Sequence, residues 1–142
     1  MVDRDVLEQL GHYFENAVTF SKHAKNRVQE VGEGRAVLYI DVEDVLLNGN
    51  GTLHGGVYST LIDNAMALAI LSVVPVRIAT TQMNVHFLGP VSRGRVVCRS
   101  EIIHRTRRTA TAEARVYDDA GTIVALGTGA FRIFEQSGNP IV

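Results

Sequence analysis

Apolar residues recur at three- and four-residue intervals from Asp5 to Phe20, and this spacing predicts an amphipathic helix. Asp5 is the expected N-cap, because Glu8 follows three residues later as in a capping box. We therefore assign residues 1–22 to an N-terminal helical segment.

A second stretch, from Val57 to Val74, is apolar on nearly every side, and Asp63 is its only charged residue. A helix without a polar face is a buried helix. In a domain of this size the rest of the chain must therefore wrap around it.

The other predicted elements are strands, because apolar residues alternate with polar ones between turn sequences. The predicted strands span residues 28–31, 35–42, 77–88, 95–105, 109–118 and 122–134. Short connections imply an antiparallel sheet. Ala125, Gly127 and Gly129 would let the last strand approach the helix closely. We thus expect one α+β domain over residues 1–142, with a long central helix in a curved antiparallel sheet and a loose tail at 135–142.

Composition narrows the class of protein. The chain has 142 residues, the size of one domain, and 14 Lys and Arg against 15 Asp and Glu, which argues against nucleic acid binding. Cys98 is the only cysteine, so an intrachain disulfide and a cysteine zinc site are excluded. The longest apolar run, Ala65 to Leu71, is too short to cross a bilayer, and the acidic start lacks a signal-peptide pattern. We expect a cytoplasmic protein without metal or membrane partners.

The first candidate site lies where a polar loop enters the apolar helix. Asn48 stands in this loop, which leads into His54-Gly55-Gly56. The N–H groups at a helix N-terminus are unpaired and lie at the positive end of the helix dipole, so they can hold a carbonyl oxygen as negative charge develops on it. Alternatively, the two glycines only shape a tight helix entry.

Asp63 is the second candidate, because a buried carboxylate costs several kcal/mol unless it is paired. It is either a functional acid, which we favour, or a structural one bonded to the backbone or to a threonine hydroxyl. Nine residues separate His54 from Asp63, or about 13.5 Å of helix. The helix start and Asp63 are expected to point to opposite sides, too far apart to hold one carbonyl. If both are catalytic, two chains must share each site, which predicts a two-fold dimer.

Two segments resemble a known family. In residues 48–63, His54-Gly55-Gly56 follows an asparagine-containing loop and Asp63 lies nine residues after the histidine; residues 80–90 read TTQMNVHFLGP. Both closely resemble the PaaI-like, phenylacetate-degradation-type branch of the hotdog-fold acyl-CoA thioesterases, over about residues 31–134. The resemblance implies the hotdog fold, homodimers that pair into tetramers, and hydrolysis of an acyl- or aryl-acyl-CoA to a carboxylic acid and free coenzyme A.

The same resemblance implies roles for the residues of the loop and helix. Gly55 would supply a backbone N–H to the thioester carbonyl, while Asn48 and His54 position the thioester end. Asp63 of the partner chain would act as general base on a water molecule or as the nucleophile, and both remain open. No cofactor is implied beyond the coenzyme A of the substrate.

A hydroxyl that assists the carboxylate is expected from Thr80, although serine is frequent at this position in the family. Arginines at strand ends and turns are expected to reach the phosphates of coenzyme A, unless they only form a solvated rim. These arginines are Arg93, Arg95, Arg105, Arg107 and Arg108. The residues predicted to contact the substrate are Gly56, Thr81, Asn84, Arg93, Arg107 and Arg108.

Two other functions stay open beside thioester hydrolysis. A hotdog enoyl-CoA hydratase or dehydratase also sets a histidine and a carboxylate across a dimer interface, but it uses the histidine to abstract a proton. A non-catalytic acyl-CoA-binding module would bind the ligand without turnover. Acyl-chain length depends on packing that the sequence does not give, at Tyr58, Met66, Ile70 and Phe87.

Overall fold

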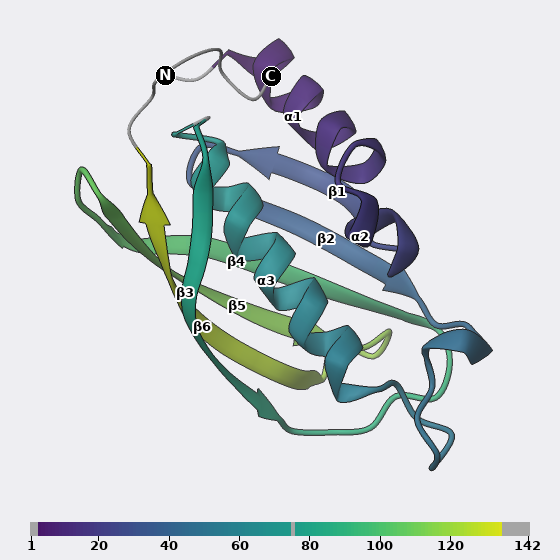
Figure 1. Ribbon diagram of the computed structural model, residues 1–142. Coiled ribbons are helices and arrows are strands. Elements are labelled where there is room, and N and C mark those ends of the chain that lie inside the picture. The colour runs from purple at the N-terminus through teal and green to yellow at the C-terminus, as the bar shows by residue number, and fades with distance from the viewer. Residues whose placement is uncertain (1–2, 75, 135–142) are drawn as a thin grey trace.

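The computed structural model describes residues 3–74 and 76–134. A six-stranded sheet in the order β1-β2-β4-β5-β6-β3 curves around the central helix α3, Gly55–Leu71. Figure 1 shows α3 along the concave face of the sheet, with the N-terminal helices beside β1. The predicted α+β architecture is confirmed.

Every strand lies within one residue of its predicted bounds, and every pairing is antiparallel. The strands are β1 (Arg27–Gly32), β2 (Arg35–Asp41), β3 (Ile78–Phe87), β4 (Arg95–Arg105), β5 (Thr109–Tyr117) and β6 (Ile123–Ile133). The small residues of β6 allow this strand to approach α3 closely, as predicted. A Cβ on Gly129 would lie 2.7 Å from the Met66 side chain, and one on Gly127 would lie 3.0 Å from Ile62.

Helix α3 begins two residues earlier and ends three residues earlier than predicted. It begins at Gly55 because His54 caps it: the His54 Nδ1 accepts the N–H of Gly56 at 2.8 Å. At the other end, the Ser72 hydroxyl donates to the Ala69 carbonyl at 2.6 Å and accepts the N–H of Gly34 at 2.8 Å. The helix end is thereby fixed to the turn between β1 and β2.

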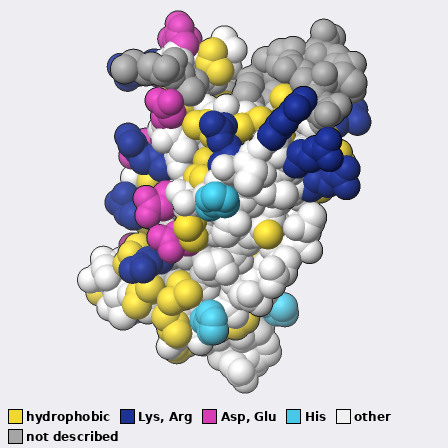
Figure 2. Space-filling view, turned by 90° about the vertical axis from the view of Figure 1, so that its left-hand side faces the viewer, with side chains coloured by type: hydrophobic (Ala, Val, Ile, Leu, Met, Phe, Trp, Pro, Cys, Tyr) yellow, Lys and Arg dark blue, Asp and Glu magenta, His cyan; other side chains and the backbone are white. Residues whose placement is uncertain are grey.

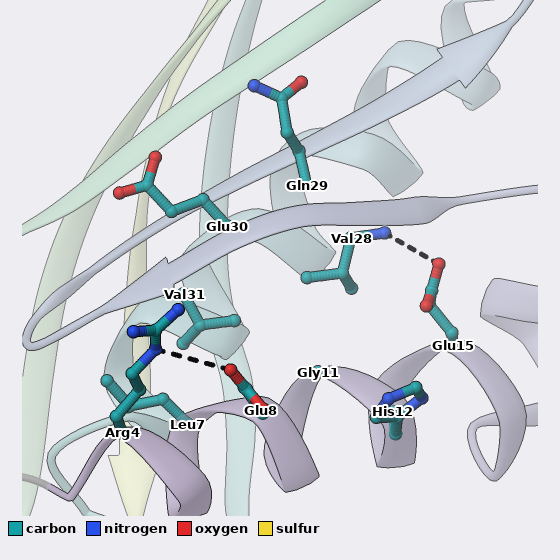
Figure 3. A pocket seen from close by; sticks show the side chains of 10 residues that line it. All are labelled: Arg4, Leu7, Glu8, Gly11, His12, Glu15, Val28, Gln29, Glu30 and Val31. Atoms are coloured by element: carbon teal, nitrogen blue, oxygen red, sulfur yellow. Dashed lines mark hydrogen bonds and ion pairs between the residues drawn. The ribbon is translucent and has the colours of Figure 1, made fainter.

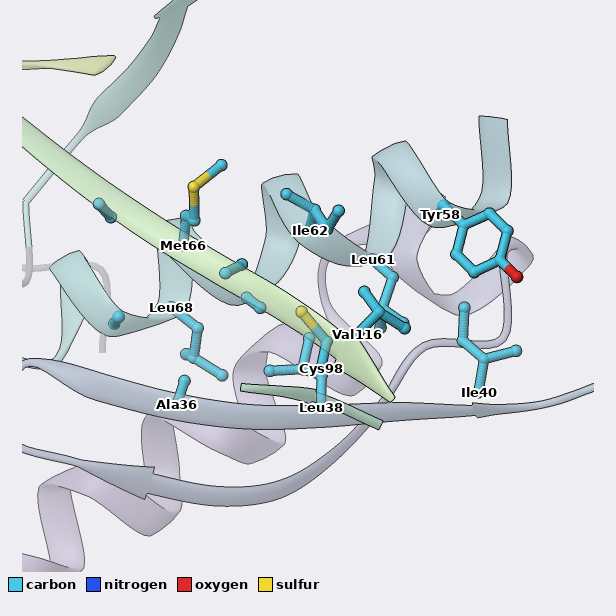
Figure 4. Close-up of a cluster of buried hydrophobic side chains, with 14 of the residues drawn as sticks. Ala36, Leu38, Ile40, Tyr58, Leu61, Ile62, Met66, Leu68, Cys98 and Val116 are labelled. Carbon is cyan, nitrogen blue, oxygen red and sulfur yellow. The ribbon is translucent and has the colours of Figure 1, made fainter. Parts of the chain in front are cut away.

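The core forms where α3 meets the inner face of the sheet. Figure 4 shows α3 side chains such as Leu61, Ile62 and Met66 beside Leu38 of β2 and Cys98 of β4. All five are fully buried. Each large aliphatic side chain among them contributes about 2 kcal/mol of hydrophobic free energy, so burial holds α3 against the sheet.

The N-terminal segment departs from the prediction of one helix. It forms α1 (Arg4–Asn16) and a short α2 (Thr19–His23). The Glu15 carboxylate accepts the backbone N–H of Val28 at 3.0 Å, which fixes the end of α1 to β1. The chain then turns at Val18, whose extended backbone precedes α2 and whose side chain packs against the core. Tertiary contacts thus override the local periodicity.

The cap of α1 also differs from the prediction. Asp3, not Asp5, is the N-cap, and its carboxylate accepts the N–H of Asp5 at 2.8 Å. Glu8 pairs with Arg4 at 3.4 Å rather than completing a capping box. The predicted loose tail at 135–142 lies outside the described residues.

Candidate active site

The loop before α3 is organised by Asn48. Its amide oxygen accepts the backbone N–H groups of Asn50 at 2.9 Å and Thr52 at 3.1 Å, and its amide nitrogen donates to the Thr52 hydroxyl at 3.0 Å. The N–H of Leu53 donates to the Val91 carbonyl at 2.7 Å. Asn48 therefore sets the shape of the loop that delivers the chain to the helix start.

The first turn of α3 leaves one backbone donor open. The N–H of His54 bonds to the Leu46 carbonyl, that of Gly56 to the His54 ring, and that of Val57 to the His54 carbonyl. Among the described residues, the N–H of Gly55 has no partner. This group lies at the positive end of the helix dipole, where it can donate to a carbonyl oxygen. The predicted substrate contact of Gly56 would have to replace its bond to His54.

A cavity of about 430 Å³ adjoins Gly55. Its lining residues are Asn48, Thr52, Leu53, Gly55, Tyr58, Phe87, Leu88, Gly89 and Pro90. The Phe87 ring lies 3.3 Å from where a Cβ on Gly55 would stand, so any side chain at this position would crowd it. Tyr58 is buried beneath, and its hydroxyl donates to the Gly89 carbonyl at 3.2 Å. The open donor thus borders a space with both apolar walls, from Leu53 and Phe87 for example, and polar ones, from Asn48 and Thr52.

Four residues were expected to set acyl-chain depth, and only two of them line this cavity. Tyr58 and Phe87 do, whereas Met66 and Ile70 are fully buried and are absent from its walls. Leu88, which lines the cavity and is 53% exposed, was not among the predicted site residues. Its only sequence signal was an apolar residue directly before the Gly89-Pro90 turn.

Asp63 lies half-buried on α3, with the Thr80 hydroxyl donating to its Oδ1 at 2.7 Å. Burial raises the pKa of the Asp63 carboxyl above its usual range, and the hydrogen bond from Thr80 opposes this rise. The result is a carboxylate that accepts a proton more readily than an exposed one. Such a group suits general base catalysis.

The bulge in β3 explains why Thr80, and not Thr81, reaches the carboxylate. The register of β3 against β6 shifts between Thr80 and Gln82, so Thr81 is an extra residue. The Thr81 hydroxyl donates instead to the Ala130 carbonyl at 3.0 Å. The structure therefore brings Thr80 and Asp63 together and leaves Thr81 at the sheet.

Asn84, a predicted substrate contact, does not join Asp63 within one chain. It is exposed between the half-buried Met83 and Val85. Because side chains alternate along a strand, Asn84 lies on the face of β3 that points away from α3.

Gly55 and Asp63 lie on the same side of α3, which corrects the expectation that they point to opposite sides. A Cβ on Gly55 would face Phe87, and Asp63 bonds to Thr80, and both of these partners belong to β3. Eight residues separate the two groups, or about 12 Å along the helix. Distance alone keeps them from sharing one carbonyl within a chain.

The expected arginine cluster is divided into two groups. Arg93 precedes β4, whereas Arg107 and Arg108 follow it, and a strand of eleven residues is about 35 Å long. Arg95 is engaged elsewhere, in a two-point ion pair with Asp41 at 2.7 and 3.1 Å. Lys and Arg side chains gather at the upper right of Figure 2, apart from the mixed charges at its left border.

Each arginine group lies nearer to one half of the site. Arg93 comes two residues after Val91, which is bonded to the loop at Leu53. The carbonyl of Arg108 accepts the N–H of Ile133, and Ile133 pairs with Ile78, which stands two residues before Thr80 in β3. Arg93 is therefore nearer to Gly55, and Arg107 and Arg108 are nearer to Asp63.

Two further hollows, of about 390 and 520 Å³, lie beside α1 and contain none of the predicted site residues. Figure 3 shows the smaller one, where α1 runs along β1 and the Arg4–Glu8 pair lies at one end. Within residues 3–74 and 76–134, no helix is long and apolar enough to cross a membrane.

Comparisons with known proteins agree with the fold. The thioesterase superfamily model matches residues 50–125. A protein of Halobacterium salinarum named "Putative esterase VNG_1336C" is 33% identical in an alignment of 122 positions that covers 77% of this chain and 80% of that protein.

Solved structures give the same result. A mutant of the phenylacetic acid degradation protein PaaI from Thermus thermophilus is 30% identical, with a TM-score of 0.76 over 82% of this chain and 99% of that one. The PaaI protein of Escherichia coli shares the fold, with a TM-score of 0.85 over 91% and 94% of the two chains at 23% identity. The chain therefore belongs to the thioesterase superfamily, as a thioester hydrolase with the hotdog fold of its PaaI-like members.

Proposed function

We propose that the protein hydrolyses an acyl-CoA or aryl-acyl-CoA thioester at two equivalent sites, each shared by two copies of the chain. The observation that carries this proposal is the separation of the open Gly55 N–H from the Asp63 carboxylate. The two groups lie about 12 Å apart on one side of α3, so each chain supplies the N–H to one site and the carboxylate to the other. A cytoplasmic location fits the unpaired Cys98.

The free edge of β3 supports the dimer. β1 is accompanied by α1, whereas β3 ends the sheet without a further strand among the described residues. Two β3 strands paired antiparallel about a two-fold axis at Asn84 would set Met83 of one chain opposite Val85 of the other and, with Thr81 as the extra residue, Thr80 opposite Phe87. This pairing would bring Asp63 of one chain to Gly55 of its partner.

In the composite site, the Gly55 N–H of one chain holds the carbonyl oxygen of the thioester. Asp63 of the other chain takes a proton from water, whose oxygen attacks the carbonyl carbon to give a tetrahedral intermediate. The carbon–sulfur bond then breaks, and the proton passes from Asp63 to the departing coenzyme A thiolate. If the carboxylate attacks directly, water hydrolyses the resulting anhydride instead. In either course, the Thr80 hydroxyl orients the carboxylate.

The two arginine groups support coenzyme A as the leaving group. Arg93 accompanies Gly55, while Arg107 and Arg108 accompany Asp63. In the proposed dimer, Arg93 of one chain and Arg107 and Arg108 of the other would lie beside the same site, where they could bind the phosphates of coenzyme A. Asn48 and His54 would keep the loop and the helix start in place for the thioester.

The hydrogen bonding of His54 weighs against a hydratase. Its Nδ1 accepts the N–H of Gly56, so this nitrogen is not available to abstract a proton. Release of thiol from a panel of acyl-CoA esters would distinguish hydrolysis from the other two functions. Hydration of an enoyl-CoA without thiol release would favour the hydratase, and binding of coenzyme A without either reaction would favour the binding module.

The catalytic proposal is tested with Gly55→Pro and Gly55→Ala. Both substitutions add a Cβ beside Phe87, but only proline removes the N–H, and proline is well accepted at the first helical position. We expect Gly55→Pro to lower kcat about a hundredfold relative to Gly55→Ala. Equal activities of the two variants would contradict the role of the N–H.

Shared sites are tested by co-expressing Gly55→Pro and Asp63→Ala chains. Random pairing makes half of the dimers mixed, each with one intact site, so about a quarter of wild-type activity should return. Each variant alone should retain about a hundredth or less. Mixed dimers confirmed by mass but without recovered activity would rule out sites built across two chains.

A further inference from the structure

The central helix α3 has no polar face that would fix its rotation about its own axis. It is apolar on nearly every side, and contacts between apolar side chains are non-directional. The position of the Asp63 carboxylate depends on this rotation. A helix with its side chains has a radius of about 5 to 6 Å, so a rotation of about 10° moves the end of a side chain by about 1 Å. Directional bonds from α3 to its surroundings therefore have a direct effect on where the carboxylate lies.

Asn64, the residue after Asp63, supplies such bonds. The hydroxyls of Ser59 and Thr60 bond to carbonyls of their own helix, whereas Asn64 reaches out of α3. Its amide nitrogen donates to the Ser21 hydroxyl at 2.9 Å and to the Asn26 amide oxygen at 3.0 Å. Ser21 and Asn26 are only 1% and 2% exposed, so water does not compete for these two bonds.

The turn between α2 and β1 places the two acceptors together. The backbone N–H of Asn26 donates to the Ser21 carbonyl at 2.9 Å, and the Asn26 amide nitrogen donates to the Ala24 carbonyl at 3.3 Å. Between them, Lys25 has a φ of 61°, a conformation that residues with a side chain adopt only where their surroundings enforce it. The short helix α2 and its turn thus present one buried polar cluster to α3.

A second bond holds the next residue of the helix. The Ser100 hydroxyl of β4 donates to the Ala65 carbonyl at 2.6 Å, and Ser100 is itself buried. Asp63, Asn64 and Ala65 are therefore bonded to β3, α2 and β4 respectively, counting the bond of Asp63 to Thr80. Successive helical residues point about 100° apart, so these bonds oppose rotation from different directions. Figure 1 shows β3 and α2 on different sides of α3.

We propose that Asn64 is a positioning residue for the Asp63 carboxylate, and that Ser21 and Asn26 act on the reaction through Asn64. The inference rests on the proposed function, in which Asp63 is the base or the nucleophile. Asn64 fixes the rotation of α3 and so keeps the carboxylate at the Thr80 hydroxyl and aimed at the thioester. A misplacement of about 1 Å at a reacting group can cost about a hundredfold in rate. The segment α2 thereby contributes to catalysis, although it lines no part of the cavity at Gly55.

The test is thiol release by Asn64→Leu, which removes both hydrogen bonds but keeps a side chain of similar size that favours a helix. We expect kcat to fall roughly ten- to a hundredfold while KM changes little. The acid limb of the pH–rate profile should move to higher pH. The reason is that a displaced carboxylate loses part of the hydrogen bond from Thr80, which holds down the pKa of Asp63.

Ser72→Ala is the matched control for lost stability. It also removes two hydrogen bonds at α3, to the Ala69 carbonyl and from the Gly34 N–H, but it lies nine residues from Asp63, or about 13.5 Å along the helix. We expect Ser72→Ala to lower Tm while kcat and the acid limb stay at their wild-type values. An equal loss of kcat in Ser72→Ala and Asn64→Leu would overturn the proposal.

Ser21→Ala is a milder variant, because Asn64 keeps its bond to Asn26. It should lower kcat several-fold in the wild-type chain and have no further effect in Asn64→Leu, since it acts only through Asn64. Wild-type kcat and an unmoved acid limb in Ser21→Ala would overturn the proposal even if Asn64→Leu does not fold. So would effects that add in the double variant.

Asp63→Ala separates this proposal from the catalytic one. If Asp63→Ala loses activity while folded Asn64→Leu keeps the kcat and the acid limb of the wild type, only the positioning role is overturned. If Asp63→Ala itself keeps full activity, the proposed function is overturned, and the positioning role with it.

Discussion

The hydrogen bond from Thr80 to Asp63 should set the acid limb of the pH–rate profile. Thr80→Val removes the hydroxyl that donates at 2.7 Å but keeps a β-branched side chain in β3. The hydroxyl favours the ionised carboxylate and opposes the effect of burial on the pKa. Its removal therefore raises the pKa of Asp63 further, and the acid limb moves to higher pH.

A hydrogen bond to a charged group contributes about 1.5 to 3 kcal/mol, and the lower value applies because Thr80 is exposed in the chain. About 1.5 kcal/mol corresponds to a roughly tenfold lower kcat/KM on the acidic side of the limb. Above the limb, where Asp63 is ionised in both proteins, the two rates should converge.

The assay is thiol release from one acyl-CoA, followed from about pH 5 to about pH 9. Thr81→Val is the matched control, because the Thr81 hydroxyl bonds to Ala130 and not to the carboxylate. Thr80→Ser should retain the wild-type limb. A limb that stays in place or moves to lower pH in Thr80→Val, or an equal shift in Thr81→Val, would refute the reasoning.

Three further predictions concern stability. Because the pKa of the Asp63 carboxyl is raised in the folded state, the stability that this carboxyl contributes is lost as the pH rises through that pKa. At neutral pH, Asp63→Asn should therefore raise Tm, by about 3 °C for each 1 kcal/mol, while thiol release falls. An unchanged or lower Tm would contradict this. A Cβ on Gly127 would lie 2.9 Å from a backbone oxygen of β3, so Gly127→Ala should cost about 2 kcal/mol in urea unfolding, whereas Gly49→Ala, with nothing within 4 Å, should cost nothing measurable. Tyr58→Phe removes the hydrogen bond to Gly89 and should cost about 1 kcal/mol in the same assay; equal midpoints and slopes would show that this bond is not needed.

The strands were predictable because apolar and polar residues alternate along each of them, and the same alternation recurs in the neighbouring strands. β4 carries buried Val96, Cys98 and Ser100 on one face and charged residues on the other, so the sequence marks both its face and its length. Helix α3 was equally visible as an apolar segment. The N-terminal break was not visible, because it depends on Glu15 reaching Val28, thirteen residues away in sequence.

The candidate site was likewise predictable only in part. The chemical types were fixed by local sequence: a glycine at a helix start presents its N–H wherever that helix lies, and a lone carboxylate in an apolar helix must find a donor. The donor to Asp63 was foreseen as Thr80, but its selection over Thr81 rests on a bulge that only the register of β3 against β6 creates.

The sequence by itself therefore determined the fold, the two reactive groups and their spacing of eight residues, because helix rise converts residue number into distance. The tertiary structure decided that Gly55 and Asp63 face the same strand, and that the arginines divide between the two ends of β4. These facts depend on strand order and register, which arise from contacts between segments distant in the chain.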